Sequence, residues 1–184
     1  RVFFGARDGN IWALDAATGH YLWKHTTEGN VDATPAASGG VVYAPSVDGN
    51  FYARSAAGAD EPVWTHATGS QDMSSPVVSD GLVYWTTGFP GKSLMALNAV
   101  TGAVVWQKDI ENNSLASPTL ESGVIAVGAN NGKIAVFDAA TGAPKWTAAT
   151  TGRIEFSSLA GDGQGYLYGV SGGDDPNLYA WNAL

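Results

Sequence analysis

The most informative stretch of this sequence reads Ala13-Leu14-Asp15-Ala16-Ala17-Thr18-Gly19, followed four residues later by Trp23. It returns at 96–102 as Ala-Leu-Asn-Ala-Val-Thr-Gly and at 136–142 as Val-Phe-Asp-Ala-Ala-Thr-Gly, with a weaker copy at 53–58. An Asp, Asn or Ser side chain accepts hydrogen bonds from amides two residues on, and Gly tolerates a positive φ. Each copy therefore predicts a tight turn between two strands.

Two independent markers repeat with the same period. Tryptophans stand at Trp23, Trp64, Trp106 and Trp146, at intervals of 41, 42 and 40 residues. Thr34-Pro35, Ser75-Pro76, Ser117-Pro118 and Ser157-Ser158 follow at the same intervals of 41, 42 and 40. Because periods of this length are typical of repeat architectures, the chain is predicted to be a tandem array of similar units.

Each unit is predicted to hold four strands. A second turn signal precedes the first, as Asp8-Gly9, Asp48-Gly49 and Asn131-Gly132, and such pairs mark two-residue hairpins. For the second unit the strands are expected at 33–38, 41–46, 50–56 and 62–67. In the third and fifth units the hairpin is longer, giving loops 87–93 and 171–177. Segments apolar on both strand faces, such as residues 11–14, indicate sheets packed between other sheets.

These features predict an all-β chain, a β-propeller of four-stranded antiparallel blades. The expected blades are 1–31 (partial), 32–72, 73–113, 114–154 and 155–184 (partial). Counting strands gives three, then three whole blades, then three, an incomplete ring of about four to five blades. We therefore expect further propeller blades, from the same or another chain, to complete the ring, because an open ring leaves strand edges unpaired.

Composition narrows the classes of partner. Nine Lys and Arg against seventeen Asp and Glu give a net charge of −8, the opposite of what phosphate-backbone binding requires, so no nucleic acid is expected. No apolar run reaches the length of about 18 residues that a membrane span needs. There are no cysteines, which excludes disulfides, thiolate metal sites and cysteine nucleophiles.

The Ala-Leu-Asp-Ala-Ala-Thr-Gly phrase with its following Trp resembles the tryptophan-docking repeat of the quinoprotein-type, or PQQ-like, propeller family. That family includes quinoprotein alcohol dehydrogenases and the barrel-assembly lipoprotein BamB. The resemblance implies that Trp23, Trp64, Trp106 and Trp146 pack between neighbouring blades, and that Gly19, Gly102 and Gly142 occupy the family's turns. It also implies an extracytoplasmic location, either periplasmic or at the cell surface.

The loops that join each Trp strand to the next Ser-Pro strand are expected at one mouth of the propeller axis, where this family places its cofactor. The candidate contacts for a partner or a small polar ligand there are Asn30, Asp32, Gln71, Asp72, Asn113, Arg153 and Glu155, joined by Asp174 and Asp175 of the long loop 171–177. The alternative interpretation is that they are solvent-facing loop residues. His25 and His66 share one repeat position, and we expect them to be ordinary surface residues rather than metal ligands.

Two functions remain open at this stage. The first is a non-catalytic scaffold or protein-recognition platform, with no catalytic residue, metal site or cofactor. The alternative is the propeller portion of a PQQ- and Ca²⁺-dependent alcohol or sugar dehydrogenase, which needs a carboxylate base and oxygen ligands for the ion. The adjacent-cysteine disulfide of many alcohol-oxidising relatives cannot form here, which favours the first.

Overall fold

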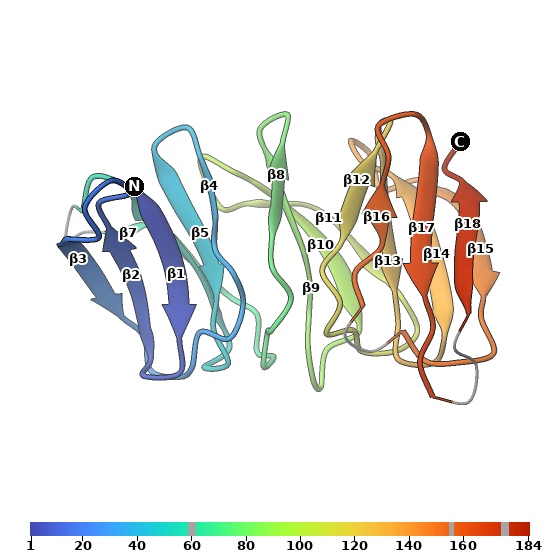
Figure 1. The fold of residues 1–184 in the computed structure, drawn as a ribbon, viewed down its shortest axis with the longest axis horizontal. Coiled ribbons are helices and arrows are strands. Elements are labelled where there is room, and N and C mark those ends of the chain that lie inside the picture. The colour runs from blue at the N-terminus through green and yellow to red at the C-terminus, as the bar shows by residue number, and fades with distance from the viewer. Residues whose placement is uncertain (59–61, 155–156, 174–176) are drawn as a thin grey trace.

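The chain folds into five antiparallel sheets that stand side by side along an open arc (Figure 1). A computed structural model describes residues 1–58, 62–154, 157–173 and 177–184. Within these ranges the regular elements are eighteen strands, in sheets of three, four, four, four and three. The expected all-β propeller with an incomplete ring is confirmed, and so is the expected strand count.

The strands of each sheet follow one another in chain order. Blade 1 comprises β1 (Val2–Ala6), β2 (Asn10–Leu14) and β3 (Tyr21–Thr26). Blade 2 comprises β4 (Ala36–Ser38), β5 (Val41–Pro45), β6 (Asn50–Ser55) and β7 (Pro62–Ala67). Blade 3 comprises β8 (Val77–Ser79), β9 (Leu82–Thr86), β10 (Ser93–Asn98) and β11 (Val104–Asp109). Blade 4 comprises β12 (Thr119–Glu121), β13 (Val124–Gly128), β14 (Lys133–Asp138) and β15 (Pro144–Ala149). Blade 5 comprises β16 (Ala160–Gly161), β17 (Tyr166–Val170) and β18 (Leu178–Asn182).

The first strand of blade 2 is shorter than the sequence predicted. In blade 2 it begins at Ala36 rather than at residue 33, because Pro35 has no N–H and the Thr34 amide is used elsewhere. That amide donates to the Ser75 hydroxyl of the next blade at 2.9 Å. Ser75 N–H donates in turn to Ser117 Oγ at 2.8 Å, and Ser117 N–H to Ser158 Oγ at 3.0 Å.

This chain of bonds, here called the hydroxyl relay, runs from blade to blade through Thr34, Ser75, Ser117 and Ser158. The relay explains why a Ser or Thr recurs before the Pro: its hydroxyl or its amide bonds to the neighbouring blade. In blade 5 the acceptor is Ser158, one residue later than the period indicated.

The turn phrase behaves as its residues predict. Asp15 Oδ1 accepts the Thr18 N–H at 2.9 Å and the Thr18 hydroxyl at 2.8 Å, and these bonds hold the pKa of Asp15 below its usual value. Gly102 has a positive φ of 72° and a second constraint, because a Cβ there would lie 2.7 Å from the Trp64 ring. Gly142 faces Trp106 in the same way at 2.8 Å, whereas nothing lies within 4 Å of such an atom at Gly19. The repeated glycine therefore has two roles, in turn geometry and in packing between blades.

The four repeat tryptophans each reach the next sheet with the indole N–H. The acceptors are the carbonyl oxygens of Ala56 for Trp23 (3.2 Å), Ala99 for Trp64 (3.0 Å), Ala139 for Trp106 (3.0 Å) and Ala183 for Trp146 (3.3 Å). Trp64 and Trp106 are 9% and 7% exposed, and the other two are half-buried.

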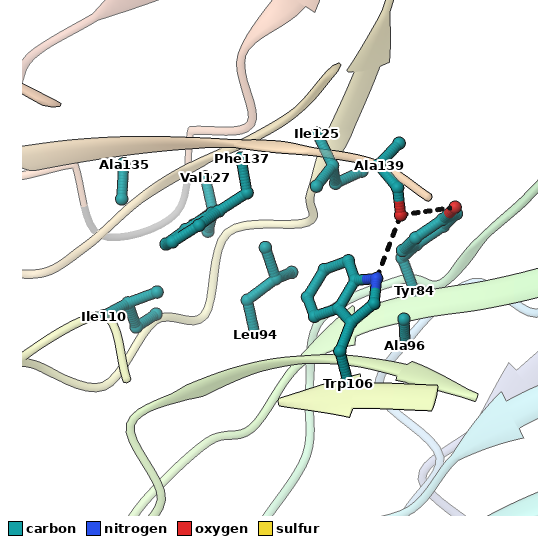
Figure 2. Packing of buried hydrophobic residues seen from close by; sticks show 10 residues of the cluster. All are labelled: Tyr84, Leu94, Ala96, Trp106, Ile110, Ile125, Val127, Ala135, Phe137 and Ala139. Atoms are coloured by element: carbon teal, nitrogen blue, oxygen red, sulfur yellow. Dashed lines mark hydrogen bonds between the residues drawn. The ribbon is translucent and has the colours of Figure 1, made fainter. Parts of the chain in front are cut away.

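The hydrophobic core is divided into four clusters, one between each pair of neighbouring blades. Figure 2 shows the cluster between blades 3 and 4, where Leu94 and Trp106 face Ile125 and Phe137. Both the Trp106 indole and the Tyr84 hydroxyl donate to the Ala139 carbonyl, at 3.0 and 3.1 Å. Burial raises the pKa of Tyr84 to about 12, so its hydroxyl keeps its proton.

A carboxylate joins blades 4 and 5 outside this core. Glu121, at the end of β12, accepts the N–H groups of Gly163 and Gly165 in the hairpin between β16 and β17, both at 2.9 Å. Ser122 donates to the same carboxylate at 2.7 Å. The Ser122 bond, followed by the backbone bonds, holds the pKa of Glu121 below its ordinary value, so the group stays ionised at neutral pH.

Candidate recognition surface

One end of the arc gathers the hairpins between the middle strands and the loops that join the blades. This end is here called the mouth face, and its hairpins lie along the lower edge of Figure 1. In four blades the joining loop bonds to the hairpin through the main chain: Val47 N–H to Asn30 O (3.0 Å), Gln71 N–H to Phe89 O (2.9 Å), Asn130 N–H to Asn113 O (3.2 Å) and Gly172 N–H to Arg153 O (2.9 Å). The two long loops therefore share a face with the joining loops, as predicted.

Each of the four polar joining-loop residues bonds to a hairpin through its main chain: Asn30, Asn113 and Arg153 accept through their carbonyls, and Gln71 donates its N–H. Their side chains differ. Gln71 and Arg153 are exposed, while Asn30 and Asn113 are half-buried. The Asn113 side-chain oxygen accepts a hydrogen bond from the Asn130 amide at 3.3 Å.

The acidic candidates are separated rather than gathered. Asp32 forms an ion pair with Arg7, with 2.9 Å between Oδ1 and Nε. Glu155, Asp174 and Asp175 lie outside the described residues. Asp72 has no exposed surface: its carboxylate accepts the Trp85 indole N–H at 3.2 Å and the Gly88 N–H at 2.9 Å. Asp72 therefore lies beneath the mouth face and not on its lining.

The two histidines are not the ordinary surface residues that the sequence suggested. Each is half-buried against an aromatic ring of the next blade, His25 at 5.5 Å from Tyr52 and His66 at 6.2 Å from Trp85. Burial lowers the pKa of both rings, so they are neutral at pH 7. Among the residues that the structure describes, no group of three His, Cys, Asp or Glu side chains is placed to hold a metal ion.

The tip of loop 87–93 presents an exposed aromatic ring on the mouth face. Phe89 is 66% exposed, and the peptide bond joining it to Pro90 is cis. Both residues form the wall between two hollows. One, of about 340 Å³, is also lined by Asp48 and Gln71. The other, of about 250 Å³, reaches Lys92 and Glu111. Sequence analysis had noted the length of this loop but not its exposed ring.

Asp48 gives the larger hollow an acidic wall and is itself well bonded. Its Oδ2 accepts the Tyr52 hydroxyl at 2.8 Å and the Glu28 N–H at 2.9 Å. Burial, followed by this bond to Asp48, raises the pKa of Tyr52 to about 12. These two bonds fix the Asp48 side chain in place at the wall of the hollow.

Sequence reasoning missed an apolar hollow of about 380 Å³ at the opposite end of the blades. It lies between blades 2 and 3 and is lined by Val41, Val63, Val78 and Val100, among others. Val63 and Val100 are 42% and 76% exposed. Single apolar residues in turns and at strand ends gave no pattern from which it could have been found.

Residues 54–164 match the sequence model of a protein family described as outer membrane protein assembly factor BamB. The chain belongs to this family. The expected resemblance to PQQ-like propellers is thereby confirmed. A BamB from Burkholderia pseudomallei (strain K96243) is 30% identical over 187 residues, which is 93% of this chain and 46% of that protein.

Solved structures agree on the fold. The crystal structure of BamB from Moraxella catarrhalis superposes with a TM-score of 0.78 at 22% identity, over 98% of this chain and 53% of the other. Two computationally designed proteins are also similar: Ika8 (TM-score 0.78, 17% identity, 97% of this chain and 54% of that one) and Ika4 (0.73, 14%, 91% and 100%). The chain thus spans about half the length of the BamB proteins it matches. Its described residues include no helix long and apolar enough to cross a membrane.

Proposed function

We propose that this chain is a non-catalytic propeller that recognises protein partners through its mouth face, outside the cytoplasm. The observation that carries the proposal is Phe89, which is 66% exposed at the tip of a loop bonded to the neighbouring blade. Large aromatic side chains presented beside hollows are typical anchors of protein interfaces. The name of the BamB family points to outer-membrane protein assembly, so the partners would be other proteins of that process.

The alternative, a PQQ- and Ca²⁺-dependent dehydrogenase, requires several side-chain oxygens to converge on one ion. Three acids that the structure describes at or beneath the mouth face are engaged separately. Asp32 pairs with Arg7, Asp48 bonds to Tyr52, and Asp72 is buried. This donor set does not fit the ion, which favours the recognition hypothesis.

Site-specific photo-cross-linking tests the recognition surface. A photoreactive residue is placed at position 89 of the full-length protein in the envelope of its own host. The matched control is position 100 at the opposite end of the blade, because the apolar side chain of Val100 is at least as exposed as that of Phe89, at 76% against 66%. We expect position 89 to capture a component of the outer-membrane assembly machinery and position 100 to capture none. Equal capture at both positions, or capture at position 100 alone, would contradict the proposed surface.

The catalytic alternative has a test of its own. Full-length protein is incubated with PQQ and Ca²⁺, and a bound chromophore and dye-linked alcohol or sugar oxidation are measured. We expect neither. Oxidation that depends on both PQQ and Ca²⁺ would overturn the non-catalytic proposal. Recovery of the protein in the cytoplasmic fraction of its host would count against the proposed location.

A further inference from the structure

Asp72 breaks the pattern of the repeat at a buried position. It directly follows Gln71, and the residues that follow the equivalent Asn30, Asn113 and Arg153 are Val31, Ser114 and Ile154. Those three are 1%, 0% and 1% exposed, and Asp72 is 0% exposed. A position that is otherwise apolar or small therefore holds a carboxylate in the joining loop that bonds to Phe89 of loop 87–93.

No described cation neutralises this carboxylate through an ion pair. Its partners are the Trp85 indole N–H, the Gly88 N–H and the Thr68 hydroxyl. The charged side chain that acts on it electrostatically is Asp48 of the preceding blade, whose negative charge raises the pKa of Asp72 further. Beyond the indole lies one more titratable ring, that of His66.

The bond from Gly88 to Asp72 can fix the exposed tip, because Gly88 directly precedes Phe89. A Cβ at Gly88 would lie 1.8 Å from the Gln71 carbonyl oxygen, so the two segments pack in direct backbone contact. Gln71 N–H donates to the Phe89 carbonyl at 2.9 Å, and Asp72 accepts the adjacent Gly88 N–H at 2.9 Å. Residues 71 and 72 thus hold the tip on both sides of the Gly88–Phe89 peptide group.

The burial of Asp72 disfavours its charged form. Desolvation raises the pKa of Asp72 from 3.8 to about 6, against the opposing effect of its hydrogen bonds. Because the folded pKa lies above the unfolded value, the folded protein takes up a proton between these limits. Stability from this group therefore rises as pH falls from about 6 toward 3.8, and at neutral pH the carboxylate opposes folding. A residue that opposes folding while it fixes one loop fits a positioning role better than a packing role.

We infer that Asp72 is the positioning residue of the Phe89–Pro90 tip: its carboxylate holds the tip in the form presented to a partner, and protonation loosens it. The inference rests on the proposed function, since the tip is its recognition element. Both carboxylate oxygens face N–H donors, on Gly88 and on Trp85. A proton on either oxygen removes the negative charge and occupies one acceptor site, so both charge-assisted bonds to the N–H donors become weaker. Presentation of the tip thereby becomes dependent on pH.

The test uses the free full-length protein. The Trp85 indole N–H and the Gly88 amide are followed by NMR between pH 4.5 and pH 8, and Gly88 amide exchange is corrected for its intrinsic pH dependence. We expect both signals to titrate together with a midpoint near 6, and Gly88 protection to fall roughly tenfold on the acid side, as for the loss of a charge-assisted bond. In Asp72→Asn both signals should become independent of pH. His66→Gln is the matched control, and it should leave the midpoint unchanged.

Signals that do not titrate in the wild-type protein would overturn the inference, even if a variant failed to fold. So would a titration that persists in Asp72→Asn or disappears in His66→Gln. The outcome is separable from that of the proposed function. Capture of a partner at position 89 with no Asp72 titration would leave the recognition surface standing and remove the role of Asp72. A titration without capture would do the reverse.

Discussion

The Ala139 carbonyl offers a sharp test of how neighbouring blades are joined. It accepts two buried donors, Trp106 Nε1–H at 3.0 Å and the Tyr84 hydroxyl at 3.1 Å. Tyr84→Phe leaves the carbonyl bonded to the indole and should cost about 1 kcal/mol, the net worth of one neutral bond. Trp106→Phe leaves it bonded to the tyrosine, and costs more because part of a buried aromatic is lost as well.

The double variant removes both donors from a carbonyl that stays buried. An unsatisfied buried acceptor costs about 1–3 kcal/mol. We therefore expect the double variant to be less stable than the sum of the single changes by roughly 1–2 kcal/mol. The four proteins are compared by urea unfolding, followed by far-UV circular dichroism so that loss of an indole does not alter the signal.

A second cycle supplies the control. Tyr43 bonds to a different carbonyl, that of Ala99, at 3.1 Å, so Tyr43→Phe and Trp106→Phe share no acceptor. Their effects should add to within about 0.5 kcal/mol. A coupling between Tyr84 and Trp106 that is no larger than this control value would refute the shared acceptor.

Three further outcomes follow from the geometry. Gly102→Ala should lower the thermal stability more than Gly81→Ala does. Both glycines have a positive φ, of 72° and 77°, but only at Gly102 would a Cβ meet a tryptophan ring. Gly81→Ala should therefore cost only the backbone strain, about 1–2 kcal/mol. Ser117→Ala should cost about 1 kcal/mol and speed exchange of the Ser75 amide, while exchange that stays slow would disprove the hydroxyl relay. Because hydrogen bonds lower the pKa of Glu121, its stabilising effect is present above its ordinary pKa of 4.5 and is lost as pH falls below that value. Glu121→Gln should flatten this acid limb of the stability curve, and an unchanged limb would count against a stabilising role for the Glu121 bonds to Gly163 and Gly165.

Much of the fold could be predicted because its signals are local. The turn at residues 15–19 depends on Asp15 and Gly19 alone, and hairpin pairs such as Asp48-Gly49 act within four residues. The count of eighteen strands then follows from the period. The start of β4 could not be predicted, because the Thr34 amide leaves its own sheet for the Ser75 hydroxyl, forty-one residues away in sequence.

The candidate site was predicted less well, because exposure there depends on contacts between loops. Spacing alone placed Asn30, Gln71, Asn113 and Arg153 in successive joining loops, and each of them bonds to a hairpin through its main chain. The sequence could not reveal that Asp72 points inward to Trp85 and Gly88, because an acid in a joining loop reads as solvent-facing. His25 and His66 were misjudged for the same reason: the rings that cover them belong to the next blade.

The hydroxyl relay and the indole bonds determine where this chain can accept insertions without disturbing the packing of its blades. Each full blade is fixed at its first strand by a Ser or Thr of the relay, and at its last by a Trp that bonds to the next blade. The hairpin between the two middle strands lies outside both fixed points, so residues can be inserted there without moving the neighbouring blades. Loop 87–93 is such an insertion, and β9 still pairs with β10 in unbroken register beside it. Loops of other lengths and sequences grafted at this site should therefore give new binding specificities on an unchanged scaffold.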